Sequence, residues 1–115
     1  MTRIADAVRA GRADEVRSLL SEGEDPNQTS GLLLEPLVLL AAASGSAATL
    51  EALLAAGADP NARDFGGGTA LHEAAREGNA AMIRALVARG AELETFAKDT
   101  GYTALGWAIW YARNP

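Results

Sequence analysis

Residues 68–94 read GTALHEAAREGNAAMIRALVARGAELE, and this stretch decides the fold. Thr69 carries a hydroxyl that can accept hydrogen bonds from the backbone N–H groups of a helix's first turn. Gly78 and Gly90 stand where two helices would end, because glycine adopts the left-handed conformation without a Cβ clash. Between these glycines the apolar residues recur at the spacing of an amphipathic helix, and they are Met82, Ile83, Leu86 and Val87. The stretch therefore predicts a helix, a turn, a second helix and an irregular loop.

The same unit recurs along the chain with a nearly constant period. Glycines lie 12 residues apart in three pairs, which are Gly11 and Gly23, Gly45 and Gly57, and Gly78 and Gly90. The second and third pairs are offset by 33 residues, and the first and second pairs by 34. Two short motifs also return, since Thr69-Ala70-Leu71 matches Thr103-Ala104-Leu105 and Asp25-Pro26-Asn27 matches Asp59-Pro60-Asn61. A period near 33 residues with a T-x-L-H-x-A core indicates a stacked array of helical repeats.

The motifs in the third copy resemble those of ankyrin-repeat proteins, and the resemblance covers nearly the whole chain. They are Gly68-x-Ala70-Leu71-His72-x-Ala74-Ala75, then Gly78-Asn79, then Gly90-Ala91. Single copies depart from the family pattern: Ala70 and Ala104 replace a proline, Gly106 replaces the histidine, and Val38-Leu39 replaces Leu-His. The resemblance implies an all-α fold, an ankyrin-repeat α-solenoid of helix–turn–helix pairs with projecting β-hairpin-like loops.

We expect one domain spanning residues 1–115, divided into four copies of the unit. These are an N-terminal capping repeat at 1–28, repeats at 29–62 and 63–96, and a C-terminal half repeat at 97–115. Polar residues such as Arg3 and Asp6 would give the first copy the wetter surface that a terminal repeat needs. The half repeat is rich in aromatic residues. Three interpretations stay open: an aromatic lid closes the stack, the chain is a truncated piece, or another chain completes the end.

Composition excludes several classes of function. The chain has no cysteine, so it can form neither a disulfide framework nor a cysteine-based zinc site. Its net charge of −5 argues against a nucleic-acid partner, which would need a clustered basic surface. The sequence contains no apolar run long enough to span a membrane and no signal-peptide core, so we expect a cytoplasmic protein.

We expect no catalytic, cofactor-binding or metal-binding residues. His72 is the single histidine, and its place three residues after Thr69 predicts a structural bond to that hydroxyl. No Ser or Cys nucleophile stands with a base and an orienting group. Asp59, Asn61 and Asp64 lie close in sequence, but Asp59 and Asn61 match a repeating turn. The three glycines at 66–68 predict a tight turn with positive φ rather than a phosphate-binding loop, since no Lys-Ser/Thr follows them.

The resemblance implies a binding groove lined by the hairpin tips and by the two residues that end each first helix. In this sequence the expected partner-binding residues are Leu32, Leu33, Leu34, Arg63, Phe65, Arg76, Glu77, Asp99, Tyr102, Trp110 and Tyr111, with Ala43, Ser44, Gly66, Gly68 and Thr100 at related positions. The leucines at 32–34 have two interpretations: they fold back over the neighbouring repeat, or they contact a partner.

The expected function is a non-enzymatic protein-protein interaction module that binds a partner protein through the concave groove and hairpin tips. The alternative is a self-associating domain, in which the incomplete half repeat pairs with a second chain through Trp107, Ile109 and Trp110. The expected state is accordingly a monomer or a weak homodimer. A mass that rises with concentration would distinguish self-association from binding to another protein.

Overall fold

The computed structural model describes residues 3–31 and 35–91. Within these ranges the helices come in pairs: α1 (Arg3–Arg9) with α2 (Ala13–Ser21), α3 (Leu37–Ser44) with α4 (Ala47–Ala55), and α5 (Ala70–Glu77) with α6 (Ala80–Ala88). Two short strands, β1 (Thr29–Ser30) and β2 (Glu35–Pro36), precede α3. The expected half repeat at 97–115 and the leucines at 32–34 lie outside the described residues.

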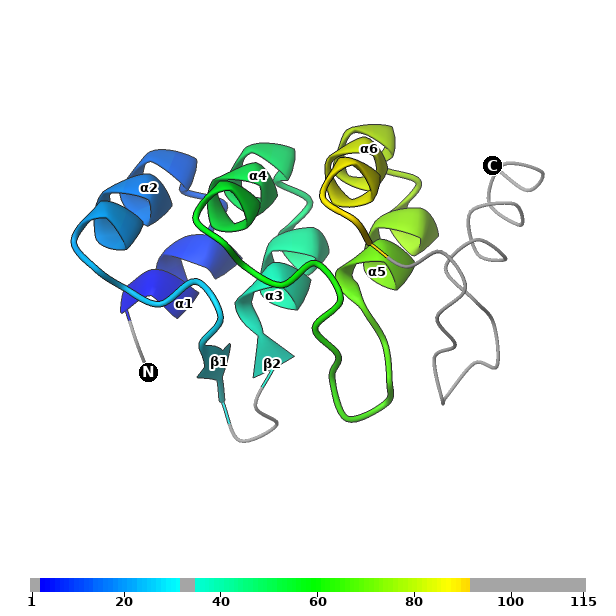
Figure 1. Ribbon diagram of the computed structural model, residues 1–115, viewed down its shortest axis with the longest axis horizontal. Coiled ribbons are helices and arrows are strands. Elements are labelled where there is room, and N and C mark those ends of the chain that lie inside the picture. The colour runs from blue at the N-terminus through cyan, green and yellow to red at the C-terminus, as the bar shows by residue number, and fades with distance from the viewer. Residues whose placement is uncertain (1–2, 32–34, 92–115) are drawn as a thin grey trace.

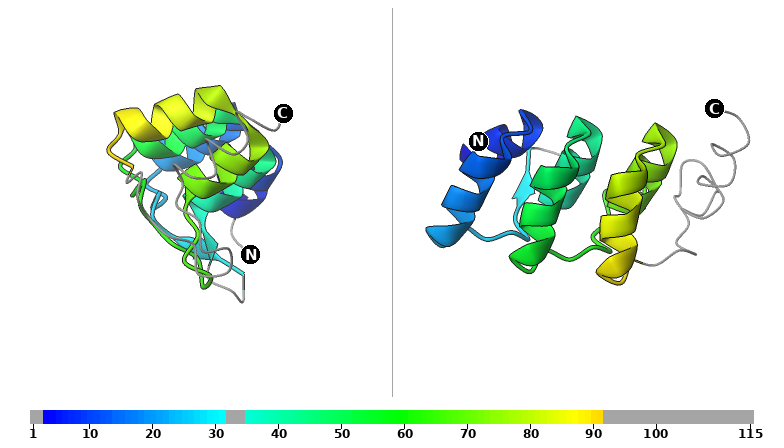
Figure 2. Two further views of the ribbon diagram at one scale, coloured as in Figure 1. Left: turned by 90° about the vertical axis from the view of Figure 1, so that its right-hand side faces the viewer. Right: turned by 90° about the horizontal axis from the view of Figure 1, so that it is seen from above.

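The helices form two rows that run along the stack (Figure 1). The first helices α1, α3 and α5 pack side by side in one row, and the second helices α2, α4 and α6 form the other row. The loops between repeats project from the first-helix row, away from the second helices, as the left view of Figure 2 also shows. This arrangement confirms the predicted all-α ankyrin-repeat solenoid.

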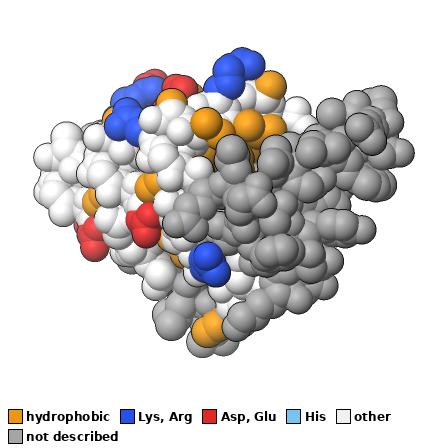
Figure 3. Space-filling view, turned by 45° about the vertical axis from the view of Figure 1, so that its right-hand side comes forward, with side chains coloured by type: hydrophobic (Ala, Val, Ile, Leu, Met, Phe, Trp, Pro, Cys, Tyr) orange, Lys and Arg blue, Asp and Glu red, His pale blue; other side chains and the backbone are white. Residues whose placement is uncertain are grey.

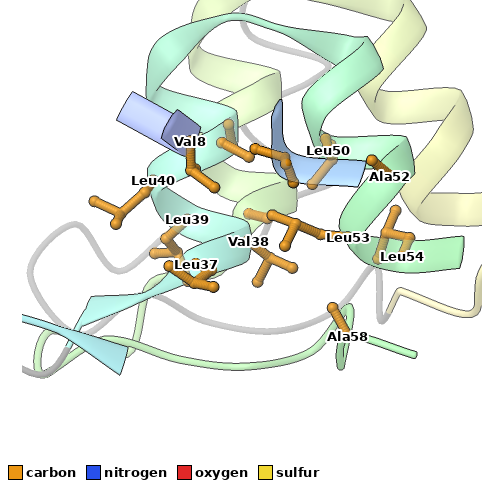
Figure 4. Packing of buried hydrophobic residues seen from close by; sticks show 14 of the residues in the cluster. Val8, Leu37, Val38, Leu39, Leu40, Leu50, Ala52, Leu53, Leu54 and Ala58 are labelled. Atoms are coloured by element: carbon orange, nitrogen blue, oxygen red, sulfur yellow. The ribbon is translucent and has the colours of Figure 1, made fainter. Parts of the chain in front are cut away.

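The core lies between the two rows, and the middle repeat is its centre. Every residue of α3 from Leu37 to Ala42 is buried, because α1 and α5 cover its two sides and α4 covers a third. Leu50 and Leu53 of α4 are fully buried as well. Figure 4 shows apolar side chains from α3 and α4 meeting between the two helices. Burial of a leucine side chain contributes about 1.5–3 kcal/mol, so this repeat supplies a large share of the folding free energy.

The ends of the helices follow the sequence motifs. Gly45 and Gly78 close α3 and α5 at φ +77° and +68°, where any side chain would strain the backbone. Thr69 caps α5, since its side chain accepts from the His72 N–H. Ser46 and Asn79 cap α4 and α6 by accepting from the N–H groups three residues later. In the second and third copies the first helix therefore ends at a glycine, and the next residue caps the start of the second helix.

The Asp-Pro-Asn motifs form turns, as predicted, and also join successive repeats. Asp25 Oδ1 accepts from the Asn27 N–H at 2.9 Å, which closes the turn locally. Asn27 then reaches the next repeat: its Nδ2 donates to Gly57 O at 3.2 Å, and its Oδ1 accepts from the Asp59 N–H at 2.7 Å. Asn61 repeats the first of these bonds by donating to Gly90 O at 3.2 Å. Hydrogen bonds of the loops thus fix the spacing of the helical pairs.

Pro36 pairs with Thr29 in the β1–β2 hairpin, and α3 begins at the next residue, Leu37. One sequence prediction differs from the structure. Val87 was expected on the buried face of α6, but it is 45% exposed and Ile83 beside it is half-buried. The buried face of α6 is centred on Met82 and Leu86, which point toward the helices already in the stack.

Candidate functional site

The two residues before the glycine that follows each first helix form a row of exposed side chains. The pairs are Arg9-Ala10, Ala43-Ser44 and Arg76-Glu77, and all six residues are exposed. They occupy matching positions, immediately before the glycine that ends each first helix, yet their chemistry differs from copy to copy. The repeated residues of the same helices are buried instead, as Ala41 and Ala74 show. Exposed, non-repeated residues on a rigid scaffold are suited to recognition.

Charge along this row is mostly paired within single helices. Arg9 forms an ion pair with Asp6 at 3.5 Å, and Arg76 forms one with Glu73. Because one member of each pair, Asp6 or Arg76, is more than half exposed, each pair contributes little to stability. The predicted site residues Arg76 and Glu77 are therefore available at the surface, although Arg76 already has a partner on its own helix.

The loop before α5 is a rigid turn organised by Asp64. Its Oδ1 accepts from the N–H groups of Gly66 and Gly68, both at 2.9 Å, and its backbone oxygen accepts from the Gly67 N–H at 3.1 Å. Among the three glycines only Gly67 has a positive φ, of 80°. A Cβ on Gly68 would lie 3.3 Å from the Asp64 carboxylate. The tight-turn prediction is confirmed, and these amides already have acceptors, which removes the phosphate-loop interpretation.

Phe65 stands at the tip of this turn. Its side chain is 67% exposed, the largest exposure of any bulky apolar residue in the described part of the chain, and the neighbouring Arg63 is also exposed. Beside Phe65 is an open pocket of about 170 Å³ lined by Glu35, Asp64, Phe65 and Gly66. Sequence reasoning missed Glu35 because the residue belongs to the preceding repeat, and no local motif marks it.

His72 is a structural residue. It is 6% exposed, its Nδ1 accepts from the Thr69 N–H at 3.2 Å, and the same nitrogen lies 2.9 Å from Thr69 Oγ1. Thr69 and His72 thus cap α5 reciprocally, which confirms the bond predicted between them. In the described ranges no group of three or more acidic, histidine or cysteine side chains could hold a metal ion. Asp59 Oδ1 accepts from the Asn61 N–H at 2.8 Å, as the turn interpretation predicts.

Several predicted site residues lie outside the described residues, and these are Leu32, Leu33, Leu34, Asp99, Tyr102, Trp110 and Tyr111.

A second depression, of about 460 Å³, lies on the opposite side of the molecule, between α2, α4 and α6. It is lined largely by alanine, with Arg17, Glu51 and Arg89 around it. No helix among the described residues is long and apolar enough to cross a membrane.

Comparison with known proteins agrees with this architecture. The cyclin-dependent kinase 4 inhibitor B of Bos taurus is 40% identical over 75 residues, which cover 64% of this chain and 56% of the relative. The cyclin-dependent kinase inhibitor 2A of Homo sapiens is 38% identical over 92 residues, which cover 79% of this chain and 58% of the relative. The chain thus spans little more than half the length of these two relatives. A family model described as "Ankyrin repeats (3 copies)" matches residues 38–115, more than half of the sequence, and the chain belongs to this ankyrin-repeat family.

Proposed function

We propose that this chain is a non-enzymatic interaction module that binds a partner protein through its loop tips and the exposed ends of its first helices. One observation carries the proposal. Residues that repeat from copy to copy are buried or hydrogen-bonded, whereas residues that differ between copies are exposed in a row beside the loops. A scaffold whose core residues repeat between copies, while the exposed residues of one surface differ, can recognise a partner without catalysing a reaction.

The first partner to test is a cyclin-dependent kinase. The relatives from Bos taurus and Homo sapiens are named inhibitors of such kinases, and their similarity extends over most of this chain. Phe65 and Arg76 are the described side chains best suited to anchor a partner, because aromatic residues and arginine dominate the binding energy of interfaces. Both are exposed, on a loop and a helix end of the same repeat.

The test is calorimetric titration of the chain with purified cyclin-dependent kinase 4. We expect binding that Phe65→Ala and Arg76→Ala each weaken by about tenfold or more, as hot-spot truncations costing over about 1.4 kcal/mol would do. Glu51→Ala on the outer side of α4 is the matched control and should leave affinity unchanged. Absence of binding would reject the kinase as partner. Binding weakened by Glu51→Ala or Arg89→Ala alone would place the interface on the α2–α4–α6 side and reject the proposed surface.

Self-association is the second candidate, and one observation favours it. At the end of the described stack Val87 is 45% exposed and Ile83 is half-buried, so α6 presents apolar surface there. Figure 3 shows hydrophobic side chains gathered on the upper part of the described surface at this end. Light-scattering mass measured across a concentration series tests it. A mass rising toward a dimer, and reduced to the monomer by Val87→Glu, would support self-association, and a constant monomer mass would reject it.

A further inference from the structure

We infer that the pocket between the β1–β2 hairpin and the loop before α5 receives an arginine side chain from the partner protein. The inference rests on the proposed function, and it specifies that the partner protein presents an arginine side chain to this pocket. The pocket is lined by Glu35 of β2 and by Asp64, Phe65 and Gly66 of the next loop, so it exists only because two repeats stack. Two acidic residues and one aromatic residue therefore line a common opening.

The turn that carries the Phe65 ring is already closed by hydrogen bonds before any partner binds. Phe65 follows Asp64 directly, and Asp64 Oδ1 holds the amides of Gly66 and Gly68 on the far side of it. These bonds hold the backbone on both sides of Phe65, whose side chain is 67% exposed, so binding needs little further ordering of the turn's backbone. A cation placed over the face of such a ring is attracted by its quadrupole, and arginine makes this contact more often than lysine.

The carboxylates supply the complementary charge. Glu35 is half-buried; its backbone pairs with Ser30 in the β1–β2 hairpin, and its carboxylate has no hydrogen bond or ion pair to another described residue. Asp64 uses Oδ1 for its turn, and no described group donates to its Oδ2. Residues 29–62 contain three acidic residues, Glu35, Glu51 and Asp59, and no lysine or arginine. No cation within the second repeat competes for the pocket.

Shape and charge together favour a guanidinium over an ammonium group. A planar guanidinium can stack on Phe65 while its N–H groups bond a carboxylate in bidentate fashion, which a lysine cannot do. The volume of about 170 Å³ is well above the roughly 10–15 Å³ that a cavity needs to hold one water, so a group larger than one water can enter. Arg63 directly precedes Asp64 in the sequence and is exposed, so we expect its positive charge to weaken the binding of a cation here.

The probe for the test is N-acetyl-arginine amide, titrated into the full chain and followed by NMR at the Gly66 amide and the Phe65 ring. We expect saturable shifts at these positions, and none with N-acetyl-citrulline amide, a neutral molecule of the same shape. Glu35→Gln and Phe65→Leu should each raise the Kd at least threefold. Arg63→Gln should lower it, because a like charge is removed. Glu51→Gln, an exposed carboxylate outside the pocket, is the matched control and should have no effect.

Three results would overturn the inference: shifts that do not saturate, equal binding of the citrulline probe, or an unchanged Kd for Glu35→Gln. The titration needs no partner protein, so its outcome is independent of the kinase experiment. Failure here with retained partner binding would remove the arginine pocket alone. Saturable arginine binding without any partner binding would instead reject the kinase and keep the pocket.

Discussion

The second helices of the middle and third repeats have matching apolar positions but different burial. Leu54 of α4 corresponds to Val87 of α6 by the 33-residue period, yet Leu54 is 3% exposed and Val87 is 45% exposed. The difference follows from the neighbours: α4 lies between α2 and α6, whereas the described helices that contact α6 are α4 and α5. In a stacked array, burial of a residue is thus set by the next repeat as much as by its own helix.

The largest expected effect separates these two positions directly. Leu54→Ala should lower the free energy of unfolding by about 2–5 kcal/mol, because it leaves a cavity between α4 and its neighbours. Val87→Ala should cost less than about 1 kcal/mol, as surface substitutions do. Val16→Ala makes the same chemical change at a fully buried position of α2 and should cost about 1–3 kcal/mol. Urea denaturation of the three variants measures all three values.

If Val16→Ala and Val87→Ala lowered the free energy of unfolding equally, the difference in burial between α4 and α6 would not hold in solution. It would mean that Val87 is covered in solution, either by the remaining part of this chain or by a second copy. The concentration dependence of the urea midpoint separates these two explanations, because only association between chains makes stability depend on protein concentration.

A smaller effect concerns the bonds that tie the middle repeat to the first. Asn27→Ala removes the donor to Gly57 O and the acceptor for the Asp59 N–H, and should cost about 1–2 kcal/mol. Ser21→Ala is the control, because its hydroxyl bonds only within α2, to Ser18 O, and it should stay within about 0.5 kcal/mol of the wild type. If both variants unfold at the same urea concentration, the side-chain bonds between repeats contribute nothing measurable.

The helices and their ends could be predicted from the sequence, because glycine positions and apolar spacing are local signals. The sequence could not predict which neighbouring helix buries each helix face. Periodicity marks Ile83 and Val87 as apolar, but it does not show which helix lies against them. Asn27 shows the same limit, because its turn was visible in the motif but its reach to Gly57 was not.

In the candidate site, too, some residues could be predicted from the motif of one repeat, and others come together only when two repeats stack. Phe65 and Arg76 follow from the family pattern and are exposed, as a binding role requires. Glu35 joins them only through stacking, so no motif within one repeat could reveal it. The role of each of these residues in binding stays a prediction.

The smallest effect tests the cap that differs between the two second helices. Ser46 caps α4, and Asn79 caps α6 while its Nδ2 also donates to Gly45 O at 3.3 Å in the middle repeat. Asn79→Ser gives α6 the same cap residue as α4 and removes only the bond between repeats, so it should cost about 0.5 kcal/mol. Asn79→Ala removes the cap as well and should cost about 1 kcal/mol more. Equal midpoints for the two variants would show that the cap contributes nothing, and that the bond to Gly45 alone makes asparagine useful at this position.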